Sequence, residues 1–209
     1  INGVLLRSLK SKFLHVDTFA IQNYGDKKYN EEVSFFNYSL PSTGADEIDF
    51  STFRDGLNLN TARSCYQYSN VHGFYGSLMH VFRMWKDVSK CKEAIESAEK
   101  KHNTKYDAIV RWRYDYEPVR IDIEHLYDLD GTIYNSERDV GIEDSLAFGP
   151  RHLMMEYISY PIKWLHQWFK SGNICNTPLV SERLFQEAMV AKNVNIEYTP
   201  FLQAKKKFE

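Results

Sequence analysis

The sequence has 209 residues, which suits a single domain built around one hydrophobic core. Hydrophobic residues make up 43% of the chain and aromatic residues 15%, which favours a folded protein with stacking surfaces over a disordered one. The formal net charge is only −2, which excludes a global electrostatic attraction to nucleic acid or to an anionic membrane.

Cysteine usage and hydropathy argue against further classes. Cys65, Cys91 and Cys175 lie far apart, so neither a zinc site nor a disulfide framework is expected. No signal peptide is recognisable, and no apolar run reaches the roughly 18 residues of a membrane span. These features predict a cytoplasmic protein. The abrupt apolar start and the lysines at 205–207, a solvated tail or linker, favour a domain cut from a longer protein.

The first part of the chain predicts strands and one long polar segment. Short apolar runs predict strands over residues 3–9, 14–21 and 33–38. Residues 41–73 are polar and aromatic with weak periodicity, so they are expected to wrap the surface, with a short helix over 46–54.

A long helix is expected next, with Ser77 as its N-cap. Its apolar residues recur at spacings of three and four, which predicts one buried stripe. The stripe consists of Leu78, Val81, Trp85, Val88, Cys91, Ile95 and Ala98. Residues 102–105 break the pattern, 106–114 predict a strand, and irregular turns are expected after Pro118.

The second half alternates strands with helices. Strands are predicted over 132–135, 144–148 and 194–198. Gly149 and Pro150 are expected to stop the second of these strands and start a helix, which Pro161 kinks or splits. A last helix begins at Thr177 and Pro178 and ends at Asn193. This alternation predicts an α/β domain with a central, mostly parallel or mixed sheet flanked by helices.

The run YDAIVRWRYDYE, residues 106–117, carries the most informative pattern. Alternate residues of a strand share a face. The residues expected on one side are Arg111, Arg113, Asp115 and Glu117. Because ligands of α/β sheets bind beyond the carboxyl ends of strands, the two acids could hold Mg²⁺ or Mn²⁺ on a diphosphate while the arginines bind phosphate oxygens. The alternative is a surface strand end with Arg–carboxylate pairs.

A second acidic pair, Glu143 and Asp144, precedes an apolar strand and could face the same cleft. Asp144 could accept the proton of a hydroxyl group, with Glu143 as its substitute. The alternative is a pair of solvated loop acids. Gly149 either permits close backbone approach or only marks the start of the next helix.

Four further residues are weaker candidates for nucleotide binding. Arg7 and Ser8 end the first predicted strand, where a base or ribose could bind, or form an ordinary strand terminus. Tyr75 and Ser77 open the long helix, whose N-terminus could favour an anion or simply be capped.

Together these motifs resemble a known family. Tyr106-Asp107 opens a strand that ends in the form Arg-x-Arg-x-Asp, and residues 144–149 have the form Asp-x-x-Ala-x-Gly. With residues 16–19 and 181–184, this layout resembles the GT-A glycosyltransferases, in particular a group of viral and bacterial sugar transferases that includes enzymes glycosylating viral capsids.

The resemblance implies a UDP-type nucleotide-sugar donor, a Mn²⁺ or Mg²⁺ ion, and transfer of a hexose or deoxyhexose to a hydroxyl of a glycan or glycoprotein acceptor. The metal motif of the family is usually Asp-x-Asp, whereas this chain has Glu117 at the last position. With Asp115 and Glu117 on the metal, Asp144 as base and no evident nucleophile, an inverting displacement is expected. A viral enzyme of this kind would act in the host cytoplasm.

Three other functions fit parts of the sequence. A nucleotidyltransferase also pairs strand carboxylates with metal ions, but its Gly-Ser lies closer to the acids than Gly76-Ser77 does here. A non-catalytic carbohydrate-binding domain could use surface tyrosines without a metal-bound diphosphate. A glycoside hydrolase would need no nucleotide.

Overall fold

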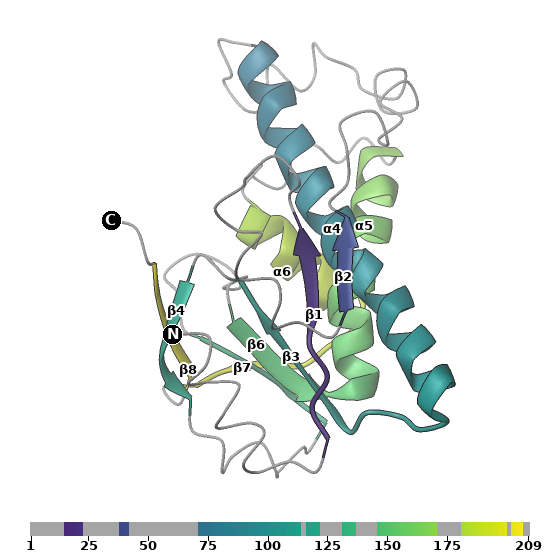
Figure 1. The fold of residues 1–209 in the computed structure, drawn as a ribbon. Helices are drawn as coiled ribbons and strands as arrows, with labels where there is room; N and C mark the ends of the chain where they lie inside the picture. Colours follow the sequence, from purple (N-terminus) through teal and green to yellow (C-terminus); the bar gives the residue numbers. More distant parts are fainter. Residues whose placement is uncertain are drawn as a thin grey trace.

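The computed structural model of the chain describes residues 15–22, 38–41, 71–113, 116–121, 131–136, 146–170, 181–199 and 202–206. These residues form the helices α4 (Val71–His102), α5 (Arg151–Lys170) and α6 (Ser181–Ala191), together with eight strands. The helices pack against a mixed sheet, and α4 is the longest element (Figure 1). The predicted α/β class is therefore confirmed.

Four strands form the central sheet in the order β3-β6-β5-β7. They are β3 (Ala108–Trp112), β5 (Ile133–Asn135), β6 (Leu146–Pro150) and β7 (Ile196–Tyr198). β6 is antiparallel to both of its neighbours, whereas β5 and β7 are parallel. The prediction allowed a mostly parallel or a mixed sheet. The described strands form a mixed sheet that is not mostly parallel.

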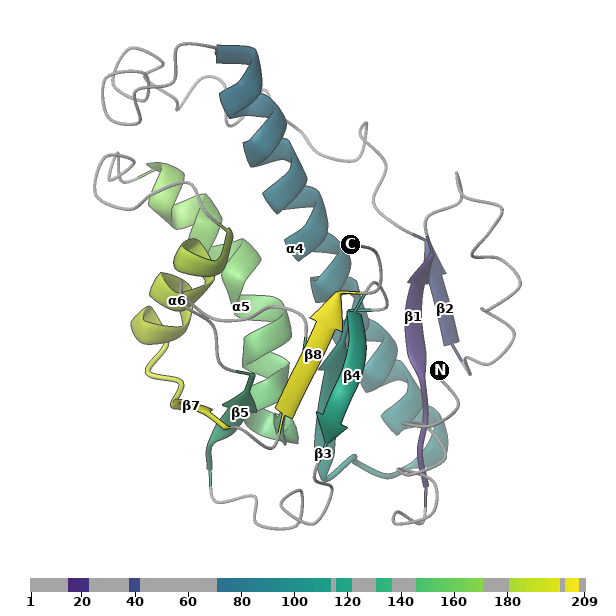
Figure 2. The ribbon, with the colours of Figure 1, turned by 90° about the vertical axis from the view of Figure 1, so that its left-hand side faces the viewer.

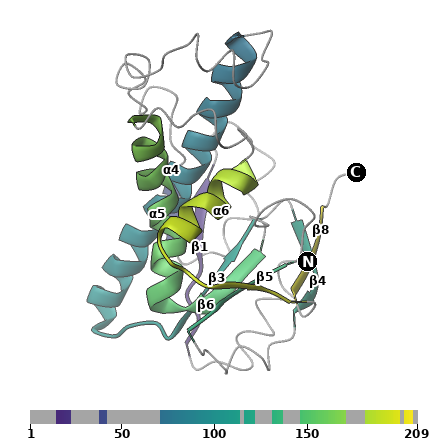
Figure 3. The ribbon, with the colours of Figure 1, turned by 180° about the vertical axis from the view of Figure 1, so that it is seen from behind.

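The core lies between this sheet and the three helices. α4 packs along α5, and α5 packs on α6 (Figure 3). The indole of Trp85 on α4 meets the ring of Phe185 on α6 edge-on, with centroids 5.8 Å apart. Ile133 and Ala147 complete the core from the sheet. Burying each large apolar side chain contributes about 1.5–3 kcal/mol, so this interface holds the layers together.

The predicted stripe of α4 is largely confirmed. Val81, Trp85, Ile95 and Ala98 are buried. Val88 and Cys91 are half-buried and pack against the core, while the side chain of Leu78 lies outside the described residues. The stripe therefore faces the core, as its spacing predicts.

The two ends of α4 compare differently with the prediction. The helix begins at Val71, so Ser77 lies inside it and is not its N-cap. Gly73 and Gly76 have poor helix propensity, which explains why the sequence favoured a later start. The predicted end is confirmed, because α4 stops at His102 and Asn103 takes a positive φ of 50°.

Helices α5 and α6 show two corrections and one confirmation. α5 continues through Pro161 as one helix, so the proline does not split it. Gly149 and Pro150 belong to β6 instead of starting the helix, because both pair with β3. Asn193, with a φ of 56°, follows the end of α6 as predicted.

Two smaller sheets lie outside the central one (Figure 2). β1 (Phe19–Gln22) pairs in parallel with β2 (Tyr38–Pro41), partly matching the strands expected there. β4 (Tyr116–Ile121) pairs antiparallel with β8 (Leu202–Lys206). The irregular turns expected after Pro118 and the solvated tail at 205–207 are therefore wrong where β4 and β8 form. Backbone pairing between distant segments leaves no local signal.

The expected strand over 3–9 and the helix over 46–54 lie outside the described residues. In the part of the chain that the structure describes, no helix is both long and apolar enough to cross a membrane.

Candidate functional site

Three strands of the central sheet end at the same edge. β3, β5 and β7 run in one direction and end at Trp112, Asn135 and Tyr198, while the reversed strand β6 begins there with Leu146. Trp112 pairs with Leu146, and Asn135 pairs with Tyr198. We call the edge formed by these four residues the carboxyl edge. Ligands of α/β sheets bind at such an edge.

Both predicted acidic segments continue from this edge. Asp115 follows Trp112 by three residues, and Asp144 precedes Leu146 by two, with Glu143 next to it. Because Trp112 and Leu146 are paired, the two segments leave the sheet from neighbouring strands. The three acids themselves lie outside the described residues.

Arg111 lies on the helix-facing side of β3. Ile109 packs against the core, and strand alternation places Arg111 on the same face. Burial raises the pKa of the Cys91 thiol on α4 to about 11, and the nearby positive charge of Arg111 opposes this rise. Arg113 follows β3 and is half-buried. An anion bound by Arg111 would therefore lie between β3 and α4.

The chain changes sheets within the 106–117 run. β3 ends at Trp112, and Glu117 lies in β4, where its backbone pairs with Lys205 of β8. The prediction that Arg111, Arg113, Asp115 and Glu117 share one strand face is therefore wrong. Alternation of residue types continues through both strands, although the backbone leaves one sheet and joins another. β8 contacts β6, so the second sheet lies beside the first.

The metal site stays a prediction. Among the described side chains, no group of three His, Cys, Asp or Glu residues could hold a metal ion. The side chains of Asp115 and Glu117 are not among them. Their carboxylate oxygens are the ligands that Mn²⁺ and Mg²⁺ prefer, so the donor chemistry fits either ion.

Buried polar residues gather at the carboxyl edge. Asn135 is fully buried, and Ser136 and Thr199 are 5% and 7% exposed. The Nδ2 of Asn135 donates to the hydroxyl of Tyr157 at 3.1 Å. The backbone carbonyl of Asn135 accepts from the backbone nitrogen of Thr199 at 3.0 Å. Sequence reasoning missed these residues, because an Asn-Ser pair at a strand end is a common turn signal.

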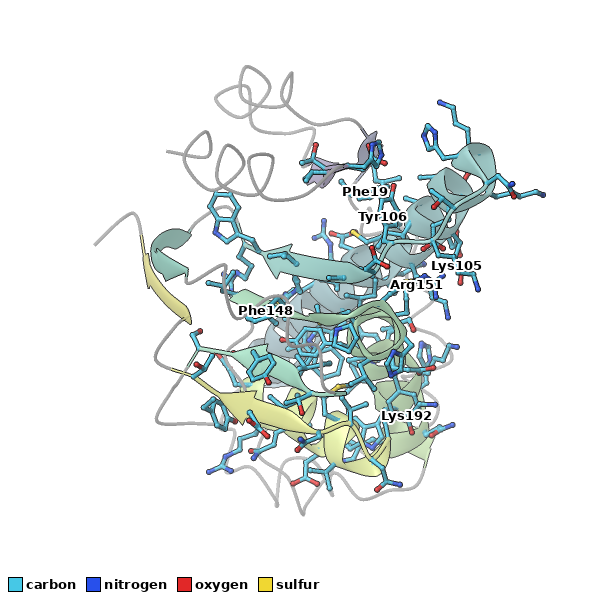
Figure 4. The ribbon with its side chains drawn as sticks, turned by 90° about the horizontal axis from the view of Figure 1, so that it is seen from below. Phe19, Lys105, Tyr106, Phe148, Arg151 and Lys192 are labelled. Atoms are coloured by element: carbon cyan, nitrogen blue, oxygen red, sulfur yellow. The ribbon has the colours of Figure 1, made fainter. Side chains whose placement is uncertain are left out.

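The opposite end of β3 carries an ion pair. Glu99 accepts hydrogen bonds from Arg151 Nε at 2.5 Å, from Arg151 Nη2 at 2.6 Å and from the backbone nitrogen of Tyr106 at 3.1 Å. The hydrogen bond from Arg151 is the main cause that lowers the pKa of the Glu99 carboxyl. Figure 4 shows Tyr106 and Arg151 together at this end of the sheet. The pair joins the last turn of α4 to the first residue of α5.

Asp17 is held at the same end. Its carboxylate accepts hydrogen bonds from the hydroxyl of Tyr106 and, at 2.9 Å, from His15 Nε2. Burial raises the pKa of Asp17, but these hydrogen bonds and the charges of His15 and His102 outweigh it and lower the pKa overall. Tyr106 thus anchors the segment before β1 to β3.

The remaining candidate residues are Arg7, Ser8, Tyr75 and Gly149. Arg7 and Ser8 lie outside the described residues. Tyr75 lies in the second turn of α4 instead of at its start, and its side chain is not described. A Cβ on Gly149 would lie 3.1 Å from the carbonyl oxygen of Thr132, so this glycine permits close approach of β5 and β6.

Comparison with protein-family models, curated proteins and solved structures gives no match.

Proposed function

We propose that the chain is a metal-dependent, inverting glycosyltransferase of the GT-A type that uses a UDP-type nucleotide-sugar. The observation that carries this proposal is the pairing of Trp112 with Leu146. This pairing starts both acidic segments, the one with Asp115 and the one with Asp144, from adjacent strands at the carboxyl edge. A donor bound there could be contacted from both sides.

Each polar group has a distinct role in this proposal. Asp115 and Glu117 would hold Mn²⁺ or Mg²⁺, and the ion would supply positive charge to neutralise the leaving diphosphate. Arg113 and Arg111 bind phosphate oxygens with paired hydrogen bonds. Arg111 can do so from the helix-facing side of β3.

The acceptor side uses the second acidic segment. Asp144, or Glu143 in its place, removes the proton from the acceptor hydroxyl as that oxygen attacks the anomeric carbon. The bond to the diphosphate breaks on the opposite face, which inverts the anomeric configuration. Arg7 and Ser8 contact the nucleoside in this scheme.

The test is a calorimetric titration of UDP with Mn²⁺ and again with a chelator. We expect binding that depends on the metal and is weakened at least about 10-fold by Glu117→Gln, because a neutral amide is a poorer ligand for a cation. Glu187→Gln removes the same charge from an exposed site on α6 and serves as the matched control.

Other results would favour the rival functions. Equal affinity with and without metal contradicts the proposed site. Binding of free sugars without nucleotide would support a carbohydrate-binding domain, and release of pyrophosphate from a nucleoside triphosphate would support a nucleotidyltransferase. Release of UDP from a UDP-sugar on addition of a glycan supports the proposal.

A further inference from the structure

Two consecutive residues at the carboxyl edge bury polar atoms that no other described residue pairs with. Asn135 Oδ1 and Ser136 Oγ have no hydrogen-bond partner within the part of the chain that the structure describes. Leaving a buried polar group unpaired is unfavourable, since it has lost its hydrogen bonds to water. Such groups are rare in folded proteins and call for an explanation.

Their position distinguishes these atoms from other unpaired groups. The indole nitrogen of Trp85 is also unpaired in the described structure, but Trp85 belongs to the apolar core, where its ring packs on Phe185. Asn135 instead ends β5, and Ser136 follows it. β5 lies beside β6, whose start follows Asp144, and β3, whose end precedes Asp115, lies on the other side of β6. Asn135 and Ser136 therefore lie where a ligand of this sheet is expected.

The surroundings of Asn135 fix its side chain. Its Nδ2 donates to the Tyr157 hydroxyl on α5, and its backbone carbonyl accepts from the backbone nitrogen of Thr199 after β7. The side-chain amide is thus held from α5 and the backbone from the residue after β7, and among the described residues Oδ1 is left to accept a further hydrogen bond. Preorganised groups of this kind lose little entropy when a ligand binds.

We infer that Asn135 and Ser136 form the sugar-binding part of the site, where they hydrogen-bond hydroxyl groups of a hexose. A hydroxyl group donates to Asn135 Oδ1, and the Ser136 hydroxyl can donate to or accept from a neighbouring sugar oxygen. A carbohydrate presents several hydroxyls on adjacent carbons, which suits two polar residues adjacent in the chain. This inference rests on the proposed function, because it places the donor sugar at the carboxyl edge.

The first test compares Ser136→Ala with Ser159→Ala. Both serines are buried, but Ser159 Oγ donates to the carbonyl of Met155 at 2.6 Å inside α5. Ser136→Ala removes a hydroxyl that has no partner among the described residues, so its melting temperature should be no lower than that of the wild type. Ser159→Ala should melt about 2–4 °C lower. A fall for Ser136→Ala as large as for Ser159→Ala overturns the inference, because the hydroxyl then has a structural partner such as an internal water.

The second test measures sugar binding without a nucleotide. Saturation-transfer NMR detects weak binding of free glucose, galactose, mannose and fucose. Signals for at least one sugar should be present in the wild type and in Ser159→Ala, and reduced in Ser136→Ala. Absence of all four signals in the wild type, or equal signals in both variants, overturns the inference.

A third measurement separates this inference from the proposed function. UDP and UDP-glucose are titrated with Mn²⁺ into the wild type and Ser136→Ala. The variant should lose about 3- to 10-fold in affinity for UDP-glucose and keep its affinity for UDP. Absence of UDP binding in the wild type refutes the proposed function, while the NMR result still decides the sugar site. Equal losses for both ligands overturn the assignment to the sugar.

Discussion

Glu99 and Arg151 form an ion pair whose side chains are only 7% and 22% exposed. Removing one partner of a buried pair leaves the other charge uncompensated. Glu99→Gln should therefore lower the free energy of unfolding by about 1–3 kcal/mol, less than for a fully buried pair because Arg151 reaches solvent. Urea unfolding followed by circular dichroism measures the change.

Glu96→Gln is the matched control for that variant. Glu96 lies on the same helix, is 50% exposed and approaches Lys92 at 4.0 Å. An exposed pair of this kind contributes about 0–1 kcal/mol. Equal effects of the two substitutions would show that the Glu99–Arg151 pair does not stabilise the junction of α4, α5 and β3.

A second prediction at the residue scale separates catalysis from donor binding. If Asp144 is the general base, Asp144→Asn should leave affinity for the donor nearly intact and lower turnover by roughly 10²- to 10⁴-fold. Loss of the metal ligand Glu117 should instead harm both binding and turnover. Full activity of Asp144→Asn with an inactive Glu143→Gln would assign the base to the neighbouring acid.

At the scale of elements, β8 determines whether β4 has a partner strand. An isolated strand is not stable in water, and β8 supplies the pairing of β4 along Tyr116–Ile121. A chain ending at residue 199 should therefore bind UDP with Mn²⁺ at least about 10-fold more weakly, because the backbone of Glu117 is no longer fixed. Calorimetry measures this change, and circular dichroism checks that the helices persist.

The control for this truncation ends the chain at residue 206, which keeps β8 whole. It should bind UDP as the full chain does. If the chain ending at residue 199 binds UDP as tightly as the full chain, the pairing of β4 with β8 does not position the proposed metal ligand Glu117. Lys205 and Lys206 are then not needed for nucleotide binding.

The helices show what the sequence can predict about elements. The stripe of α4 is visible in the spacing of Val81, Trp85 and Ile95, because one helix face meets one core. Strand pairing is different, since Trp112 and Leu146 are distant in sequence and their register depends on the whole sheet. In the same way, local spacing could not show that β3 and β4 pair in different sheets. The single strand face expected for residues 111–117 is therefore wrong.

The candidate site divides in the same way. Sequence patterns nominated Asp115 and Asp144 separately, but only the register of β3 and β6 brings their segments to adjacent strands. Asn135 and Ser136 could not be nominated, because their significance comes from burial and from missing partners within the described residues.

For the whole molecule, two lowered pKa values predict how stability depends on pH. The pKa values of Asp17 and Glu99 lie below their usual values near 4 in the folded chain. The unfolded chain therefore binds more protons, and both groups stabilise the fold above that pH. Their contribution should be lost as the pH falls below about 4, through the folded pKa values.

Unfolding free energies measured from pH 2.5 to 7 test this for the wild type and for Asp17→Asn/Glu99→Gln. The difference between the two proteins should be largest near neutral pH and shrink in acid. A difference that stays constant over the whole range would contradict the assignment of these carboxylates.

The pairing of β4 with β8 also has a consequence during synthesis. Translation adds roughly 5–20 residues per second. Glu117 and its partner Lys205 are separated by most of the second half of the chain. The backbone of β4 therefore leaves the ribosome several seconds before its partner strand exists. Through that interval its amide and carbonyl groups are open to pairing with other nascent chains, so production of the intact protein should benefit from slow induction or from chaperones that cover exposed strands.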